Sequence, residues 1–298
     1  MPDIYRESLR EKILKPFYNL YFDLRYGAGT DFMEEDWDNL VLLDACRYDD
    51  FREENTLEGE LDSRISRATD SPGFIRANFN GKDLTDTVYV TANPHVGKVD
   101  EGVFHAVVDE PLKEFSDELG TVPPEKVTEA AIKAGKEYPD KKLVIHYMQP
   151  HDPPIGEEGR KIREEAGMEG WRPDRSEDKG RRMMNLLAKG KIGKEEAREA
   201  YRENLRIVLG EVEKLLEQLD GKTVVTADHG EMFGESPYPF LGRMYEHWKR
   251  PKTLELCRVP WMVVENGDRR EIRAGEPEDR RITSEDEIRD KLERLGYK

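Results

Sequence analysis

Short runs of apolar residues recur along the chain, and each run stops at a polar residue or a turn. Residues 39–45 read Asn-Leu-Val-Leu-Leu-Asp-Ala, and residues 223–228 read Thr-Val-Val-Thr-Ala-Asp. Nearly unbroken apolar stretches of about four to eight residues are typical of strands buried on both faces of a parallel sheet. The same pattern predicts further strands at 86–91, 104–108, 142–147 and 259–264.

Between these strands, apolar residues recur at helical spacing. The helix predicted at 195–219 carries a continuous apolar stripe, which indicates a core-facing amphipathic helix. The helix predicted at 284–295 begins with a serine and a glutamate that can form a capping box, and the one at 124–137 begins with proline, which suits a first helical position. A fourth helix is predicted at 72–79. Strands that alternate with helices indicate a layered α/β fold with a mainly parallel sheet.

The N-terminal residues 4–26 have a pattern of their own, in which apolar side chains recur at helical spacing and Pro16 should kink the helix or start a second one. These apolar positions are Leu9, Ile13, Phe17, Leu20, Tyr21 and Leu24. We expect the stripe to pack on the domain or on a partner; because the segment is basic and rich in aromatic residues, peripheral contact with a membrane surface is the alternative. The chain thus divides into an amphipathic helical segment, 1–30, and one domain, 31–298, with a polar insertion near 153–194 whose only aromatic residue is Trp171.

Composition limits the classes of partner and compartment. The 298 residues carry a net charge of -16 and have a pI near 5.0, which argues against a general nucleic-acid or anionic-membrane binder because most of this surface would repel phosphate groups. The two cysteines, Cys46 and Cys257, lie far apart and indicate a reducing compartment without a disulfide framework. No segment approaches the roughly 20 apolar residues of a membrane span, and no signal-peptide pattern is present, so we expect a cytoplasmic protein.

Side chains that can bind a metal ion follow two of the predicted strands. Asp44 ends the first strand, and Asp228 and His229 follow the strand that begins at residue 223. Because α/β proteins place their ligands at the carboxyl ends of parallel strands, these groups should lie at a common site. Carboxylate and imidazole groups suit a divalent ion such as Zn or Mn. Taken alone, Asp228 could instead cap the next helix, with His229 merely exposed.

Three segments, in this order, resemble the alkaline phosphatase and sulfatase superfamily. They are Leu-Leu-Asp-Ala-Cys-Arg-Tyr-Asp around Asp44, His-Tyr-Met-Gln-Pro-His-Asp-Pro-Pro around His151, and Thr-Ala-Asp-His-Gly-Glu at 226–231. The resemblance covers about residues 38–265 and looks closest to the sulfatase-like branch. It implies a three-layer sandwich like that of alkaline phosphatase, with the sheet packed between helices, and a catalytic domain at 31–298 with a metal-assisted nucleophile.

The resemblance also implies a metal site. Asp44, Asp228 and His229 would bind a divalent cation (Zn, Mn, Mg or Ca), and a hydroxyl nucleophile at Thr69 or Ser71 would complete its shell. A hydroxyl is a poor nucleophile at neutral pH, and coordination to a dication lowers its pKa enough to activate it.

Further residues would act on the substrate. Arg47 would hold a nonbridging phosphate or sulfate oxygen, unless it pairs with a neighbouring carboxylate instead. His151 would face the substrate, and His247 would protonate the leaving group. We expect one metal ion; a second would use His151, Asp152 and His247. Three other histidines are expected to be structural: His95, His105 and His146.

The region of the nucleophile separates this chain from true sulfatases. Family sulfatases mature a cysteine in a Cys-x-Pro-x-Arg frame into formylglycine, and neither Cys46 nor Cys257 lies in such a frame. Residues 66–74 read Ser-Arg-Ala-Thr-Asp-Ser-Pro-Gly-Phe, which implies a hydroxyl nucleophile, as in the phosphatase, phosphodiesterase and phosphoglycerol-transferase relatives. We prefer Thr69 to Ser71, because Ser71 precedes a proline and could simply cap the helix that begins there.

Together these features predict a metal-dependent hydrolase of phosphate mono- or diesters that forms a covalent Thr or Ser intermediate. Its substrate would be a small-molecule, glycan-linked or lipid-linked anionic ester. One alternative is a transferase that passes a phospho-alcohol group to a glycan or lipid. Another is a binding protein that has kept the fold without catalysis. A true sulfatase is disfavoured, since the formylglycine precursor is missing.

Overall fold

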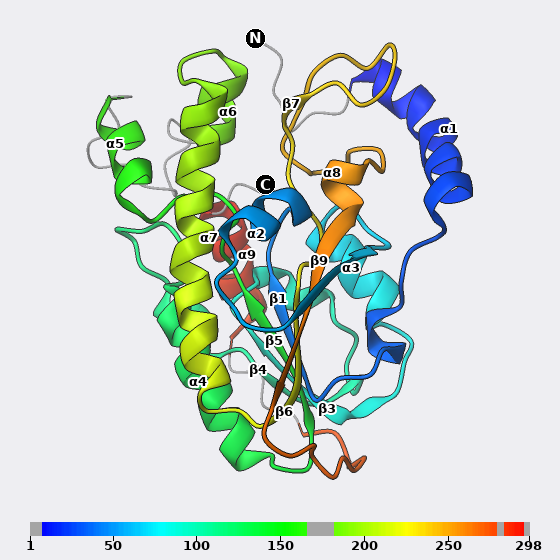
Figure 1. Ribbon diagram of the computed structural model, residues 1–298, viewed down its shortest axis with the longest axis vertical. Helices are drawn as coiled ribbons and strands as arrows, with labels where there is room; N and C mark the ends of the chain where they lie inside the picture. The colour runs from blue at the N-terminus through cyan, green and yellow to red at the C-terminus, as the bar shows by residue number, and fades with distance from the viewer. Residues whose placement is uncertain (1–7, 166–181, 279–282, 295–298) are drawn as a thin grey trace.

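A seven-stranded sheet in the order β2-β9-β6-β1-β5-β3-β4 runs through the computed structural model, which describes residues 8–165, 182–278 and 283–294 (Figure 1). Its strands are β1 (Asn39–Leu43), β2 (Glu60–Ile65), β3 (Leu84–Thr91), β4 (Phe104–Val108), β5 (Lys142–Tyr147), β6 (Gly221–Thr226) and β9 (Arg258–Asn266). All neighbours from β6 to β4 are parallel, whereas β9 is antiparallel to both β6 and β2. A small antiparallel pair, β7 (Phe233–Glu235) and β8 (Met244–Tyr245), lies apart from this sheet.

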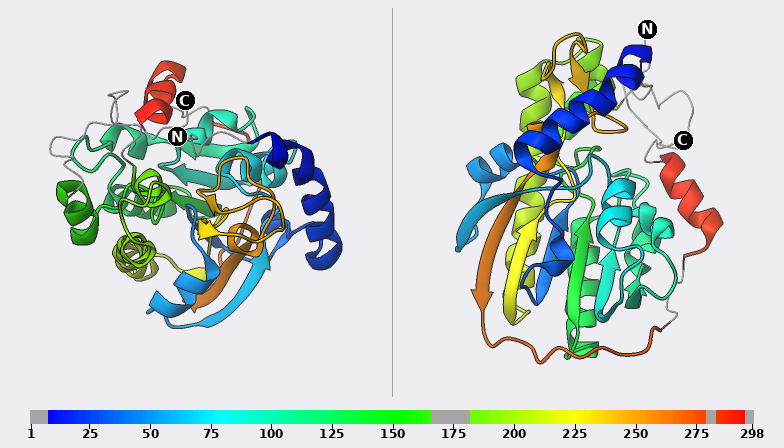
Figure 2. Two further views of the ribbon diagram at one scale, coloured as in Figure 1. Left: turned by 90° about the horizontal axis from the view of Figure 1, so that it is seen from above. Right: turned by 90° about the vertical axis from the view of Figure 1, so that its right-hand side faces the viewer.

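Helices cover both faces of the sheet. They are α1 (Leu9–Tyr26), α2 (Tyr48–Glu54), α3 (Ser71–Asn78), α4 (Pro124–Glu137), α5 (Glu157–Glu165), α6 (Met183–Ala188), α7 (Lys194–Leu216), α8 (Leu254–Cys257) and α9 (Glu285–Arg294), with short 3-10 turns η1 (Phe32–Glu34), η2 (Pro94–Lys98) and η3 (Glu110–Glu114). Helices α2, α4 and α7 lie on one face and α3 lies on the other (Figures 1 and 2). The layered α/β fold with a mainly parallel sheet is therefore confirmed.

The core forms where these layers meet. All five residues of β1 are buried, as expected for a central strand whose two faces are both covered by helices. On the α3 face, Tyr89 of β3 packs against the rings of Phe79 and Phe104. On the opposite face, the hydroxyl of Tyr147 in β5 lies 2.8 Å from that of Thr128 in α4. Aromatic rings thus pack on one face of the sheet, and a hydroxyl pair joins β5 to α4 on the other.

Each strand and helix predicted from apolar patterns is present, with shifts at the ends; residue 295, the predicted end of the last helix, lies outside the described residues. Strand β2 was not predicted, because it is a half-exposed edge strand with the polar sequence Glu-Leu-Asp-Ser-Arg-Ile. Pro16 lies inside α1 and does not end it. The insertion near 153–194 contains α5 and α6, and α6 buries apolar side chains against α7. Trp171 lies outside the described residues.

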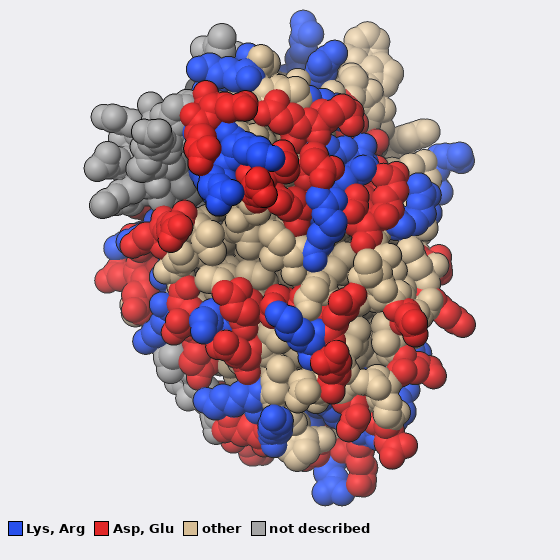
Figure 3. All heavy atoms as spheres, turned by 60° about the vertical axis from the view of Figure 1, so that its left-hand side comes forward, with Lys and Arg blue, Asp and Glu red and all other residues tan. Residues whose placement is uncertain are grey.

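The surface carries charges of both signs. Over the face drawn in Figure 3, acidic and basic side chains interleave without a large patch of one sign. None of the described helices is long and apolar enough to cross a membrane.

Candidate active site

Three parallel strands bring polar side chains to one edge of the sheet. Asp44 follows β1, Asn93 lies two residues after β3, and Asp228 and His229 follow β6. Ser71, the first residue of α3, joins them, and all five side chains are almost completely buried. The sheet edge therefore builds a compact polar site inside the protein, as the strand-end pattern predicted.

Asp44, Asp228 and His229 form a group that can hold a metal ion, since their ligand atoms lie within 4.8 Å of one another. His229 Nε2 lies 3.6 Å from Asp44 Oδ1 and 3.4 Å from Asp228 Oδ2. The other ring nitrogen, Nδ1, lies 2.8 Å from the carbonyl oxygen of Gly230, so Nδ1 donates to this carbonyl and Nε2 is the ring atom that faces the carboxylates.

The fit to a cation rests on two oxygens. Asp44 Oδ1 and Asp228 Oδ2 are buried and have no hydrogen-bond partner among the described residues. Buried carboxylate oxygens without a hydrogen-bond partner destabilise the fold unless a cation binds them. Two carboxylates and one imidazole are also a donor set that zinc or manganese accepts. The residues therefore fit a divalent metal ion.

The two carboxyl groups ionise unequally. Burial raises the pKa of Asp44 well above its ordinary value, and repulsion from Asp228 adds to this shift. Burial also acts against ionisation of Asp228, but His229 and His146 outweigh it and hold the pKa of Asp228 below its ordinary value. A dication between the two groups would favour the charged form of both.

The structure favours Ser71 over Thr69 as the nucleophile. Ser71 Oγ lies 3.4 Å from His229 Nε2 and 3.5 Å from Asp44 Oδ2, and it accepts a hydrogen bond of 3.2 Å from Asn93 Nδ2. The Thr69 hydroxyl donates to the carbonyl oxygen of Arg250 at 3.3 Å instead. The geometry therefore favours Ser71, whereas the sequence pattern favoured Thr69 as nucleophile and metal ligand.

The cap of helix α3 explains why the sequence favoured Thr69 over Ser71. We had expected that Ser71 could simply cap α3, but Asp70 is the capping residue, and its carboxylate accepts from the backbone N–H of Gly73 at 2.7 Å. Ser71 is thereby left inside the first turn, with its hydroxyl directed at the metal-binding group.

A second group of possible metal ligands adjoins the first. It consists of His151, Glu231 and His247, whose ligand atoms also lie within 4.8 Å of one another. His247 Nδ1 lies 3.0 Å from Glu231 Oε2, and the rings of His247 and His229 are 4.3 Å apart. Asp152, which we had expected to contribute to a second site, does not belong to this group; Glu231 takes its place.

Burial sets the protonation of this second group. It lowers the pKa of His247 and of His151 well below the ordinary histidine value, and neighbouring histidines add to both shifts. It raises the pKa of Glu231 to about 8. At neutral pH the dissociable proton shared by Glu231 and His247 therefore resides on Glu231. We had expected His247 itself to be protonated.

Three residues of the site were not identified from the sequence. Asn93 donates to Asp44 Oδ2 at 2.7 Å; its position after β3 was a signal of the same kind as that of Asp44. His146 was expected to be structural, but its Nε2 lies 3.7 Å from Asp228 Oδ2 while its Nδ1 lies 2.9 Å from the Tyr89 hydroxyl. Glu231 ends the Asp-His-Gly-Glu run and was not assigned a role.

Gly230 is needed between His229 and Glu231 because another backbone segment passes close to it. A Cβ atom at this position would lie 2.0 Å from the carbonyl oxygen of Glu255, so no side chain fits there. The backbone N–H of Gly230 also donates to the Leu256 carbonyl at 2.8 Å. The close approach of these two backbone segments holds the run at 228–231 against helix α8.

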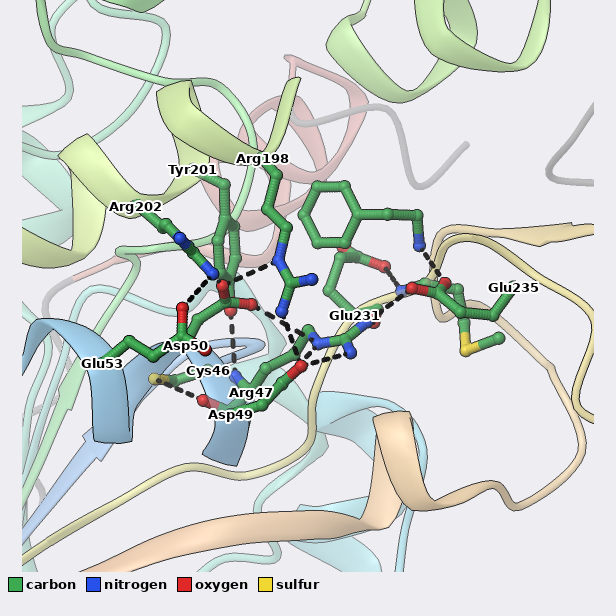
Figure 4. A network of polar contacts seen from close by, with 12 residues as sticks. Cys46, Arg47, Asp49, Asp50, Glu53, Arg198, Tyr201, Arg202, Glu231 and Glu235 are labelled. Carbon is green, nitrogen blue, oxygen red and sulfur yellow. Dashed lines mark hydrogen bonds and ion pairs between the residues drawn. The ribbon is translucent and has the colours of Figure 1, made fainter. Parts of the chain in front are cut away.

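Arg47 is not available to hold a substrate oxygen (Figure 4). Its Nε and Nη2 donate to the two carboxylate oxygens of Asp49 at 2.8 Å, and its Nη1 donates at 3.0 Å to the Glu231 carbonyl and to Glu235. Asp50, fully buried behind it, also binds Arg198 and Arg202 of α7. Arg47 therefore belongs to an ion-pair network that joins α2 to α7 and to the Glu231 backbone.

A second buried cation acts on the second group of possible ligands. Arg182, just before α6, is buried, and its charge contributes to the lowered pKa of His151 after burial and His247. It comes from the insertion that we had treated only as a polar excursion. Arg182 is thus a better candidate than Arg47 for the local positive charge that an anionic substrate requires.

No protein-family model matches the chain, and no curated protein sequence matches it. Among solved structures, it is similar to the integral membrane lipooligosaccharide phosphoethanolamine transferase EptA from Neisseria meningitidis (14% identity, 75% of this chain, 47% of that chain, TM-score 0.47). It is also similar to the C-terminal periplasmic domain of EcEptC from Escherichia coli in complex with Zn (11% identity, 80% and 75% coverage, TM-score 0.45). A third is a protein of the alkaline phosphatase superfamily from Vibrio parahaemolyticus (14% identity, 90% and 68% coverage, TM-score 0.37).

One of these solved structures is thus described as a protein of the alkaline phosphatase superfamily. The chain spans about half the length of EptA. At these identities the likeness concerns the fold alone, and nothing about activity follows from it.

Proposed function

We propose that this chain is a divalent-metal-dependent enzyme that acts on phosphate mono- or diesters, with Ser71 as its nucleophile. The observation that carries the proposal is the position of Ser71 Oγ, 3.4 Å from His229 Nε2 and 3.5 Å from Asp44 Oδ2. Asp44, Asp228 and His229 would hold the metal ion. When bound there, the ion would supply Lewis-acid chemistry that lowers the pKa of the serine hydroxyl and neutralises charge on the ester.

The chain's own residues would prepare the attack. Asn93 holds both the Ser71 hydroxyl and Asp44 in place through its two hydrogen bonds. Ser71 Oγ would attack phosphorus as the ester oxygen leaves, and water or another alcohol would then release the phosphoserine ester.

The leaving oxygen needs a proton or a second cation. Glu231, whose pKa is raised to about 8 by burial, holds a proton at neutral pH and lies within 3.0 Å of His247 Nδ1. The proton would pass from Glu231 through His247 to the leaving oxygen. If the second group binds a metal ion instead, His151, Glu231 and His247 would hold it, and that ion would stabilise the leaving oxygen.

A transferase that uses the same phosphoserine intermediate is the second candidate. It differs from the hydrolase only in the acceptor, an alcohol of a glycan or lipid in place of water. The observation that favours a lipid acceptor or substrate is the apolar face of α1, which is exposed to solvent beside the site. Transfer to an added alcohol in excess of hydrolysis would identify this activity.

The proposal is tested with purified protein, first freed of metal by a chelator and then supplied with Zn, Mn, Mg or Ca. We expect hydrolysis of 4-nitrophenyl phosphate or of its diester only with added metal, and no hydrolysis of the corresponding sulfate ester. Acid quenching during turnover, followed by peptide mass spectrometry, should find phosphate on Ser71. Metal binding that activates neither phosphate ester, with no phosphorylated serine, would leave a non-catalytic binding protein as the better description.

A further inference from the structure

Helix α1 turns its apolar side toward solvent. Leu9, Phe17, Leu20 and Leu24 are 74%, 68%, 59% and 80% exposed, and Ile13 on the same side is 58% exposed. At about 100° per residue these side chains fall on one stripe along a helix about 27 Å long. A soluble domain normally buries such a stripe, so our expectation that it packs on the domain is wrong.

The opposite side of α1 fixes this orientation. Glu11 binds the guanidinium of Arg250, and Asp23 binds Lys252 at 2.7 Å. The Tyr18 hydroxyl donates to the Pro239 carbonyl at 2.6 Å, and the Phe22 ring is fully buried among Met232, Met244 and Leu256. Polar contacts and one aromatic anchor therefore hold the helix with its apolar stripe outward.

Charge on the exposed part of α1 is positive, although the protein as a whole has a net charge of -16. The helix contains four basic residues and two acidic ones, and both acidic side chains are paired with cations of the domain. Arg10, Lys12 and Arg25 are exposed and flank the apolar stripe. An apolar stripe flanked by basic side chains is the pattern of a helix that lies in the surface of an anionic membrane.

The neighbouring loop adds to the same surface. The loop between β7 and β8 lies beside α1 in both views of Figure 2 and is joined to it by the stacked rings of Tyr18 and Tyr238, 4.2 Å apart. Phe240 in this loop is 79% exposed, and Arg243 is exposed as well. An aromatic and a basic side chain are thus available next to the stripe.

The same positive charge disfavours a second copy of the chain as the partner that covers the stripe. In a symmetric helix pair, the same patch faces itself, so Arg10, Lys12 and Arg25 of both copies would lie close together. Anionic lipid head groups meet these charges with the opposite sign and accept the apolar side chains between them.

Helix α1 is linked directly to the candidate active site. Arg250, which binds Glu11 of α1, donates its backbone N–H to the His247 carbonyl at 3.2 Å. Its own carbonyl accepts from the Thr69 hydroxyl. A membrane surface bound by α1 would therefore lie close to the candidate active site.

We propose that the exposed face of α1, together with Phe240, binds the surface of an anionic membrane and so presents lipid-linked phosphate esters to the site; the substrate class in this statement rests on the proposed function.

Flotation of the full chain with lipid vesicles tests the proposal. We expect binding to vesicles of phosphatidylcholine mixed with phosphatidylglycerol, weaker binding at raised salt, and little binding to phosphatidylcholine alone. The double variant Phe17→Ser/Leu20→Ser should lose at least about tenfold in binding, because it removes most of the apolar contact at the centre of the stripe. Lys12→Glu/Arg25→Glu should lose at least about tenfold as well.

The matched control is Lys133→Glu/Lys136→Glu on α4, which makes the same charge change at exposed positions of another helix and should leave binding within about twofold. Equal binding of the Phe17→Ser/Leu20→Ser variant and the unchanged protein would overturn the proposal, as would the absence of vesicle binding. A dimer in sedimentation that this variant dissociates would make a second copy the occupant.

Turnover of a soluble aryl phosphate by the same variants separates the two proposals. We expect it to be unchanged, since the stripe does not contact the site. Vesicle binding without turnover of any phosphate ester would refute the proposed function alone, and turnover without vesicle binding would refute the membrane surface alone.

Discussion

The assignment of Ser71 as the nucleophile can be tested against the neighbouring hydroxyl of Thr69. We expect Ser71→Ala to lower kcat/KM for an aryl phosphate by roughly 10³-fold or more, equivalent to at least about 4 kcal/mol, because the covalent route is lost. Thr69→Val should leave kcat/KM within about threefold, because the Thr69 hydroxyl bonds the Arg250 carbonyl at 3.3 Å and none of the metal-binding residues.

Stability should follow a different order from activity. In Ser71→Ala, Asn93 keeps its 2.7 Å bond to Asp44, so we expect unfolding to become easier by about 1 kcal/mol at most. Thr69→Val removes one half-buried hydrogen bond and should cost about 0.5–1.5 kcal/mol. The Thr69 variant would therefore be the less stable and the more active of the two.

The assay is steady-state hydrolysis at saturating metal, with urea unfolding of both variants as the control for folding. Full activity of Ser71→Ala together with a large loss in Thr69→Val would refute the geometric argument and restore Thr69 as the nucleophile. Loss of activity in both would mean that the loop at 66–71 is needed as a unit.

Asp228→Asn should weaken binding of Zn or Mn by at least about tenfold in calorimetry, because it removes one of two charged ligands, while a similar affinity would exclude the first metal site. Arg47→Ala should destabilise the protein by about 3 kcal/mol, since it removes one cation from the fully buried Asp50 but leaves two others; a raised KM at unchanged Tm would instead indicate substrate binding. The metal-free protein should lose stability as pH rises from about 7.5 to 8.5, by up to about 1.4 kcal/mol per pH unit for each proton. Above about pH 7.5, His95, His151 and His247 are largely neutral in both states, because burial lowers their pKa in the folded protein and free histidines titrate near 6.5. Glu231, whose pKa burial raises to about 8, still binds its proton in the folded state but not in the unfolded one. Urea unfolding at several pH values checks the sign, and stability that rises with pH would contradict it.

The strands of the sheet and the first metal-binding group could be predicted from the sequence because both depend on local patterns. A continuous apolar run identifies a buried parallel strand, and Asp44, Asp228 and His229 each follow such a run. Parallel strands end at a common edge, so these positions alone predict that the side chains meet. The half-exposed strand β2 and the short helices gave no comparable signal.

The sequence could not decide between Thr69 and Ser71 as the proposed nucleophile, because the loop at 66–71 offers two hydroxyls in a similar context. Asp70 caps α3 and leaves Ser71 directed at the metal site, while the approach of the Arg250 carbonyl binds Thr69 elsewhere. The Asp70 cap is local, but the contacts of Ser71 with His229 and of Thr69 with Arg250 depend on residues far away in the sequence.

The amino-acid sequence by itself therefore determined the layered α/β fold and the meeting of Asp44, Asp228 and His229, since periodicity and strand direction depend on neighbouring residues. Only the tertiary structure decided that Arg47, besides its local pair with Asp49, also binds Glu235 and the Glu231 carbonyl, that Glu231 joins His151 and His247, and that the apolar side of α1 faces solvent. Each of these depends on which distant charges and surfaces come into contact, and a periodic pattern carries no information about such contacts.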